Sequence, residues 1–275
     1  MIKIITDSTA YFKKSDAADF GVKIVPMRYN VGGQTYFESF SDKNGNFEEL
    51  IQSDSNFTTS QPNPASFLSA FEEELALDNE VLCITISSRL SGTYSCAYMA
   101  AKQTESDKIC VFDSQLTAGG LYLLITKAKE LIDSNMPLGE ITKKLVEIRN
   151  RISVSFSVDD RAPLRNSGRI GFVRIGVGTI LNIKPILLCE DGVVAFDSVA
   201  RGKNEIVKKL ADKIPENAQD VVINYTLNNH IASDLYNVIK EKYPNLNIRL
   251  SKIGPVLAIH LGLQAVGVSF ITGDM

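Results

Sequence analysis

The strongest constraint on the fold is a buried strand that leads through a polar loop into a helix. The run Val81–Ile86 is apolar except for Thr85, and a polar loop and then apolar residues at helical spacing follow it. Ile2–Ile5 and Ile109–Phe112 are further short apolar runs that end in polar residues. Short apolar runs that alternate with helices predict parallel strands with helices on both faces of the sheet.

The pattern changes near residue 150. From Ile152 to Val158 apolar residues alternate with serines, which is typical of a strand with one exposed face. Asp191-Gly192 lies between two apolar runs and predicts a hairpin. A chain of 275 residues also exceeds a typical single domain. We therefore predict an α/β fold with an N-terminal, mostly parallel sheet domain over 1–150 and a C-terminal mixed-sheet domain over 151–275.

Composition and charge exclude several classes of protein. The formal net charge is −3 and no basic block occurs, so we expect no nucleic-acid partner. No apolar run approaches the ~20 residues of a membrane span. Residues 1–7 turn polar too soon for a signal peptide, and the four cysteines lack metal-binding spacing. We therefore expect a cytoplasmic protein with reduced thiols and no metal.

Polar loops follow three of the predicted strands, at the edge of the sheet where α/β proteins bind ligands. These loops are Thr6–Thr9, Ser87–Thr93 and Asp113-Ser114. The middle loop is rich in hydroxyls, contains a glycine and opens a helix, whose free N–H groups and positive dipole end attract anions. It therefore predicts a site for a carboxylate or a phosphate. The alternative is plain helix capping by Ser91 or Thr93.

Ser91 also permits a different hypothesis, that of a catalytic nucleophile. His260 is available as a base, with Asp7 or Asp113 to orient it, so a serine esterase is one alternative. The nucleophile elbow of α/β-hydrolases has glycines two residues before and after the serine, and this chain has glycine at neither position. Another alternative is a phospholigand-binding α/β module, although the chain has no P-loop and no complete dinucleotide loop.

Two further polar segments are ambiguous on their own. The hydroxyl cluster Thr58–Pro62 comes just before Asn63-Pro64, a good helix start, and by itself predicts a polar loop. A cluster of arginines predicts either a solvated loop or a docking surface. The cluster comprises Arg161, Arg165, Arg169 and Arg174.

Taken together, these segments resemble the DegV family in order and spacing, across essentially the whole chain. The matching segments are Ile4–Thr9, Thr59–Pro62, Ser88–Tyr94, Leu164–Ile170, Asn182–Leu187 and Gly254-Pro255 with His260. The resemblance implies a two-domain α/β unit that binds one long-chain fatty acid, palmitate-like or oleate-like, in a buried apolar tunnel, with no other cofactor. It also implies a carrier that is not itself an enzyme and that delivers the fatty acid to a separate, ATP-binding fatty acid kinase subunit.

The resemblance further implies roles for individual residues. The residues at the fatty-acid carboxylate would be Thr59, Ser91, Gly92 and His260. Arg165 and Arg169 would lie near the entrance of the tunnel, where the kinase docks. On this interpretation Ser91 holds the ligand and does not attack it.

Overall fold

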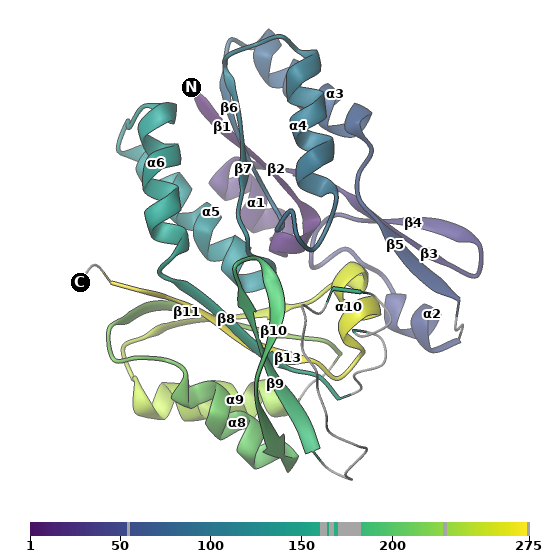
Figure 1. Ribbon diagram of the computed structural model, residues 1–275, viewed down its shortest axis with the longest axis vertical. Helices are drawn as coiled ribbons and strands as arrows, with labels where there is room; N and C mark the ends of the chain where they lie inside the picture. Colours follow the sequence, from purple (N-terminus) through teal and green to yellow (C-terminus); the bar gives the residue numbers. More distant parts are fainter. Residues whose placement is uncertain (54–55, 160–163, 165–167, 170–182, 228–229, 274–275) are drawn as a thin grey trace.

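The computed structural model describes residues 1–53, 56–159, 164, 168–169, 183–227 and 230–273. Its strands form a parallel sheet, a mixed sheet and a small antiparallel sheet (Figure 1). The parallel sheet, sheet A, has the order β2-β1-β6-β7 and is parallel throughout, as predicted. Its strands are β1 (Ile2–Asp7), β2 (Val22–Val25), β6 (Glu80–Thr85) and β7 (Ile109–Asp113).

Helices cover both faces of sheet A, which confirms the α/β prediction. One face packs on α3 and α4 through a cluster that includes Phe67 and Phe71. The other face packs on α1, α5 and α6. These helices are α1 (Lys14–Phe20), α3 (Pro64–Ala76), α4 (Thr93–Gln103), α5 (Ala118–Asp133) and α6 (Leu138–Arg149). As predicted, Asn63 caps α3, since its side chain accepts from the N–H of Ser66 at 2.8 Å.

The mixed sheet, sheet C, has the order β10-β9-β8-β13-β11-β12, and its neighbours are antiparallel except for β11 and β12. Its strands are β8 (Ile152–Ser157), β9 (Ile183–Glu190), β10 (Val193–Arg201), β11 (Ala218–Tyr225), β12 (Asn247–Lys252) and β13 (Val266–Thr272). The predicted hairpin turns at Asp191 and Gly192, which both have positive φ. Helices α8 (Gly202–Asp212) and α9 (His230–Lys242) cover one face of this sheet.

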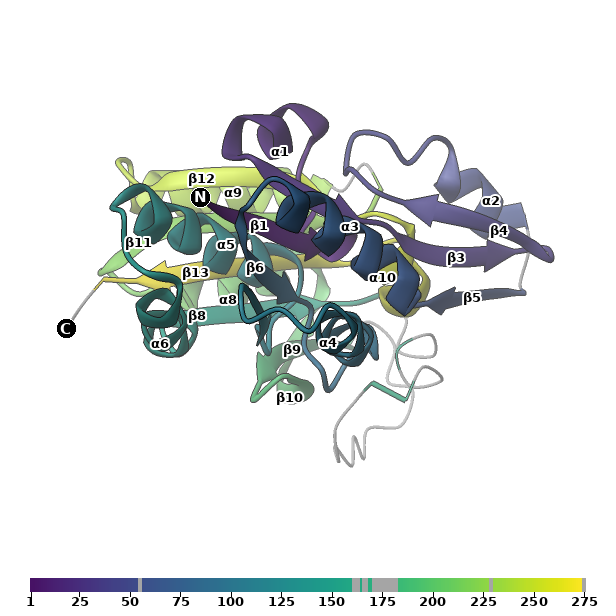
Figure 2. The ribbon, with the colours of Figure 1, turned by 90° about the horizontal axis from the view of Figure 1, so that it is seen from above.

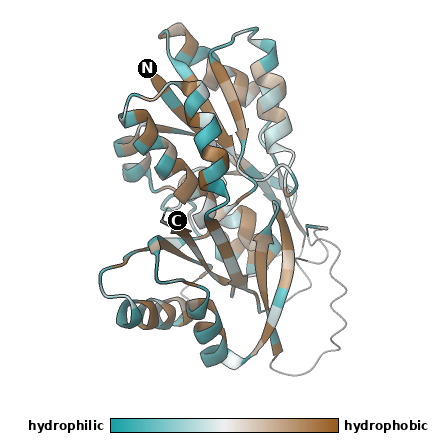
Figure 3. Cartoon of the chain, turned by 60° about the vertical axis from the view of Figure 1, so that its left-hand side comes forward, coloured by the Kyte–Doolittle hydropathy of each residue, from teal (hydrophilic) through white to brown (hydrophobic). Residues whose placement is uncertain are grey.

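Helix α5 lies between sheets A and C and joins their cores. Its apolar residues pack in one cluster with Leu82 and Ile84 of sheet A and with Val154 and Val222 of sheet C. In Figure 1 the helix runs between the upper and lower halves of the molecule. In Figure 3 the strands of both halves are mainly hydrophobic, whereas the helices are mixed in character. The end of α5 near Ala118 is thereby enclosed by elements from both halves of the chain.

The small sheet, sheet B, stands to one side of this core (Figure 2). It has the order β4-β3-β5, with β3 (Met27–Val31), β4 (Gln34–Glu38) and β5 (Phe57–Ser60) antiparallel. It packs on α2 (Phe47–Ser53) and on α10 (Pro255–Leu261), a helix from the far end of the chain. The prediction of a polar loop over Thr58–Pro62 is therefore wrong for Thr58–Ser60, because pairing with β3 holds these residues in a strand.

Candidate functional site

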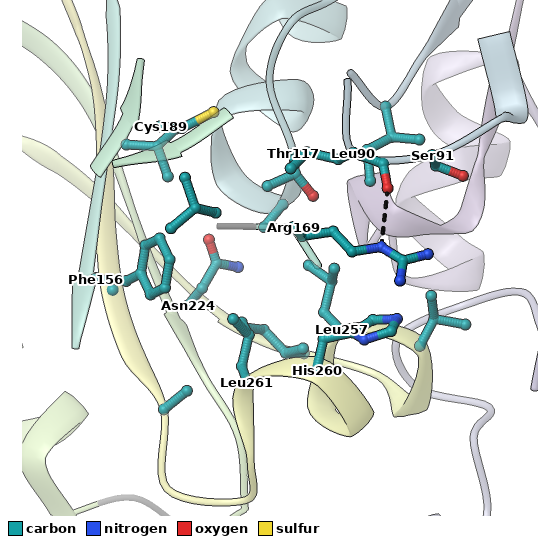
Figure 4. Close-up of a pocket in the computed structure, with 18 of the residues that line it drawn as sticks. Leu90, Ser91, Thr117, Phe156, Arg169, Cys189, Asn224, Leu257, His260 and Leu261 are labelled. Atoms are coloured by element: carbon teal, nitrogen blue, oxygen red, sulfur yellow. Dashed lines mark hydrogen bonds between the residues drawn. The ribbon is translucent and has the colours of Figure 1, made fainter. Parts of the chain in front are cut away.

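A cavity lies where sheets A, B and C meet. Together with its open mouth, and including space that is open to solvent, it spans about 1020 Å³. Most of its lining is apolar and comes from the facing surfaces of sheet C, α5 and α10, including Phe156, Val194, Leu257 and Leu261. Figure 4 shows Phe156, Leu257 and Leu261 around the cavity, with Ser91, Arg169 and His260 on one side of it.

The structure brings most of the predicted site residues together in the lining of this cavity. They are Thr59, Ser91, Gly92, Arg169 and His260. Arg165, the remaining predicted residue, lies outside the described residues. Thr59 comes from β5, Ser91 and Gly92 from the loop between β6 and α4, and His260 from α10. One polar end of the cavity is therefore assembled from segments about 30 to 200 residues apart in the chain.

Thr59 is paired with His260. The Thr59 Oγ1 and His260 Nε2 atoms are 2.7 Å apart. Burial and the nearby positive charge of Arg169 lower the pKa of His260 to about 4, so the imidazole is neutral at neutral pH. In the tautomer protonated at Nε2, His260 donates to Thr59 Oγ1. The hydroxyl proton of Thr59 is then available to a ligand.

Ser91 has a similar supporting partner in Thr93. Their hydroxyl oxygens are 2.8 Å apart, and the backbone N–H of Thr93 also donates to Ser91 Oγ at 3.3 Å. Thr93 is fully buried, so its hydroxyl can donate to Ser91 or to the Met27 sulfur at 3.4 Å, which is a weak acceptor. When Thr93 donates to Ser91, the Ser91 proton is available to a ligand. In this arrangement the hydroxyl oxygens of Thr59 and Ser91 each accept a hydrogen bond from a neighbouring protein group, and their protons are free to bind a ligand.

The loop at Ser91 also contributes to the start of α4. Gly92 is the N-cap residue of the helix and has no side chain to cap it. Ser91 Oγ accepts from the N–H of Thr93, the first residue of the helix, so capping by Ser91 and ligand binding by its hydroxyl are compatible. A Cβ on Gly92 would lie 3.2 Å from the side-chain nitrogen of Gln61, which also lines the cavity. The glycine lets the loop pass close to the β5 side of the site.

The two aspartates proposed for a catalytic trio support the Ser87–Thr93 loop instead. The buried Asp7 carboxylate accepts from the N–H of Ile86 at 2.7 Å and from Thr9. Asp113 accepts from the N–H of Ser88 at 3.0 Å. Within the described residues neither carboxylate hydrogen-bonds His260, and no hydrogen bond joins Ser91 to His260. We therefore expect a fluorophosphonate probe to leave Ser91 unlabelled.

Glu38 is a buried residue of the site region that the sequence patterns did not indicate. It ends β4, and its carboxylate accepts from the N–H of Val256 at the start of α10 and from the Ser8 hydroxyl, both at 2.8 Å. The carboxylate lies so close to Gly254 that a Cβ there would collide with it. Glu38 therefore anchors the helix that carries His260. Burial, with the charge of Asp7 nearby, raises the pKa of Glu38 to about 7.

This raised pKa predicts a pH dependence of stability. Because the folded state holds the Glu38 proton more tightly than the unfolded chain, the contribution is present below pH 4.5 and is lost as the pH rises through about 7. The Glu38→Gln variant mimics the protonated acid and does not titrate. We expect its free energy of unfolding, measured relative to the native protein, to be about 3 kcal/mol higher at pH 8 than at pH 4.5. Urea titrations of both proteins measure this gain, and a constant difference across that range contradicts it.

One of the four cysteines lies in the cavity lining. Cys83, Cys96, Cys110 and Cys189 are all free in the structure. Cys189 lines the cavity, and burial raises the pKa of its thiol to about 12. In the described part of the chain no group of three or more histidines, cysteines, aspartates or glutamates could hold a metal ion. No helix in that part is long and apolar enough to cross a membrane.

Fold and site together define an α/β protein with a largely apolar cavity whose polar end lies at the carboxyl edge of a parallel sheet. The family model described as "Uncharacterised protein, DegV family" matches residues 1–273. This chain belongs to the DegV family.

Relatives and solved structures agree with this assignment. A DegV domain-containing protein of Clostridium perfringens is 32% identical over 276 residues, which cover 98% of each chain. A fatty-acid-binding DegV family protein from Thermus thermophilus is 28% identical and superimposes with a TM-score of 0.87 over 99% of each chain. A DegV lipid-binding protein from Thermotoga maritima is 27% identical, with a TM-score of 0.88 over 99% of each chain.

Proposed function

We propose that this chain binds one long-chain fatty acid in the cavity, with the carboxylate held by Thr59 and Ser91. The observation that carries the proposal is a pair of hydroxyls at the end of an apolar cavity. The Thr59 hydroxyl is hydrogen-bonded to His260 and the Ser91 hydroxyl to Thr93. Each hydroxyl can donate to an anion at this end of the cavity without losing its other hydrogen bond. The Thermus and Thermotoga relatives, which are described as fatty-acid-binding and lipid-binding, support the same class of ligand.

The energetics favour an amphiphile with a long chain. Each buried methylene contributes about 0.8 kcal/mol, so roughly 14 of them contribute on the order of 10 kcal/mol before the costs of association. The head group then supplies orientation and a smaller part of the affinity. A phosphorylated sugar or nucleotide would leave most of this apolar lining unused.

Arg169 supplies positive charge to the polar end of the cavity. Its side chain lies between Ser91 and His260 in Figure 4, and its Nε donates to the backbone oxygen of Leu90 at 3.4 Å. The same charge, after burial, contributes to the lowered pKa of His260. We propose that Arg169 offsets part of the ligand's charge and, with Arg165, lies on the side from which a partner approaches.

The resemblance to the DegV family extends the proposal to delivery of the fatty acid. We propose that the chain is a non-catalytic carrier that presents the carboxylate to a separate, ATP-binding kinase subunit, which phosphorylates it. Hydroxyl donors suit such a role, because they hold a carboxylate without forming a covalent bond to it. Ser91 is then a binding residue, in keeping with the absence of a Ser91–His260 hydrogen bond in the described residues.

Delivery is tested with the delipidated chain loaded with palmitate or oleate. We expect one equivalent to bind, and we expect acyl phosphate, trapped with hydroxylamine, to form only when loaded chain, ATP and a fatty acid kinase subunit are all present. Binding without any acyl phosphate would contradict the delivery step and leave fatty-acid binding standing. Failure of both fatty acids to bind would contradict the whole proposal.

A further inference from the structure

The apolar part of the cavity contains a second group of polar side chains, away from Thr59 and Ser91. Thr117 precedes α5, and Asn224 and Ser269 lie on the strands of sheet C that face the start of this helix. Asn224 and Ser269 are 5% and 1% exposed, so both are buried among apolar neighbours. In Figure 4 Thr117 and Asn224 lie on the side of the cavity that also holds Phe156 and Cys189.

These three side chains converge on the start of α5. The Asn224 side-chain oxygen accepts from the N–H of Gly119 at 2.8 Å. A Cβ placed on Gly119 would lie 2.5 Å from that oxygen and 2.8 Å from the Ser269 hydroxyl. Both groups therefore lie against the first turn of a 16-residue helix, whose positive dipole end favours hydrogen-bond acceptors.

Asn224 has taken over the hydrogen bond that Thr117 would ordinarily make. Thr117 is the N-cap residue of α5, and a threonine at this position normally accepts from an N–H of the first turn. Here it makes no such bond, and the next residue, Ala118, has a positive φ of 49°. The Thr117 hydroxyl is buried and has no hydrogen-bond partner within the described part of the chain. A buried polar group without a hydrogen-bond partner destabilises the protein, and a ligand in the cavity that bonds to this hydroxyl would remove that cost.

We propose that this group is a second polar subsite, which binds a hydroxyl on the chain of the fatty acid. The subsite consists of Thr117, Asn224 and Ser269. The inference rests on the proposed function, since it assumes that an acyl chain occupies the cavity. A hydroxyl suits the subsite because it both donates and accepts, as do the Thr117 and Ser269 hydroxyls. The Asn224 amide, which accepts from Gly119 and donates to the Ser251 carbonyl at 3.4 Å, holds the start of α5 beside them. The preferred ligand is then a long-chain fatty acid oxygenated along its chain, and plain stearate leaves Thr117 without a partner.

The test compares stearate with hydroxystearates that carry the hydroxyl on successive mid-chain carbons, bound to the delipidated chain by calorimetry. In an apolar tunnel every such hydroxyl weakens binding by about tenfold or more. We expect instead that at least one positional isomer binds as tightly as stearate or more tightly. Thr117→Val should weaken that isomer about tenfold and change stearate by less than about twofold.

Thr126→Val is the matched control. Thr126 lies in the same helix, and its hydroxyl donates to the Tyr122 carbonyl, away from the cavity lining. We expect this variant to bind stearate and the preferred isomer as the native protein does. The proposed subsite is wrong if every isomer binds at least tenfold more weakly than stearate, or if Thr117→Val leaves the ratio of the two affinities unchanged. If stearate itself does not bind, the result contradicts the proposed function and not only the subsite.

Discussion

Replacing both Thr59 and Ser91 by alanine is expected to weaken fatty-acid binding about a thousandfold. Each hydroxyl donates a hydrogen bond to a charged carboxylate in the proposed complex, and such a bond contributes about 2 kcal/mol, or roughly 30-fold in affinity. Each single variant should therefore lose about 30-fold. Calorimetric titration of the delipidated variants with palmitate measures both losses.

Two neighbouring hydroxyls provide matched controls for this prediction. Thr58 precedes Thr59 in β5, and its hydroxyl is engaged with the Asn30 amide at 3.3 Å on the exposed side of the strand. Ser95 is exposed in the first turn of α4, close in sequence to Ser91. Thr58→Ala and Ser95→Ala should bind palmitate as the native protein does. If the double variant at Thr59 and Ser91 keeps full affinity, the carboxylate is held elsewhere.

Gly119→Ala should lower the free energy of unfolding by about 3 kcal/mol. Helix α5 packs so closely on sheet C that the added Cβ would lie 2.5 to 2.9 Å from Asn224, Ser269 and Val222. Forcing these groups apart combines the cost of overpacking with loss of the bond between Gly119 and Asn224. Urea unfolding measures the change. The same displacement should open the apolar end of the cavity and weaken fatty-acid binding.

Gly139→Ala in α6 is the control for this effect. In the described part of the chain no atom beyond its immediate neighbours and its own helix backbone lies within 4 Å of the position that its Cβ would occupy, and the residue lies in a helix. Alanine there should stabilise the protein by about 0.5–1 kcal/mol, because it restricts the unfolded chain and favours the helix. Equal destabilisation by both substitutions would show that close packing of α5 on sheet C is not the cause.

Features governed by local sequence were predictable. The apolar run Val81–Ile86 and the polar residues after it place the loop of Ser91 at the carboxyl edge of a parallel sheet, as observed. Asn63-Pro64 starts a helix and Asp191-Gly192 turns a hairpin, because each depends on the φ and hydrogen bonds of a few consecutive residues. That Thr59 and Ser91 lie at the same site is implied only by the resemblance to a known family, because no local pattern links the two segments.

Features that depend on contacts between distant segments were not predictable. Thr58–Ser60 form a strand only because β3 lies beside them, and no local pattern marks this pairing. Glu38 looks like the polar end of an exposed hairpin, yet α10 covers it from more than 200 residues away. Asn224 likewise caps a helix 105 residues before it in the chain. In each case a polar residue takes its role from a partner that the local sequence does not specify.

Native mass spectrometry of the protein as purified, followed by organic extraction, tests the central claim most directly. The proposed function predicts a complex that carries one fatty acid per chain, which dissociates on extraction and is identified as a free long-chain acid. A protein that carries no ligand as purified and does not bind added palmitate or oleate would contradict the proposed function. A phosphorylated ligand bound in place of the lipid would also contradict it.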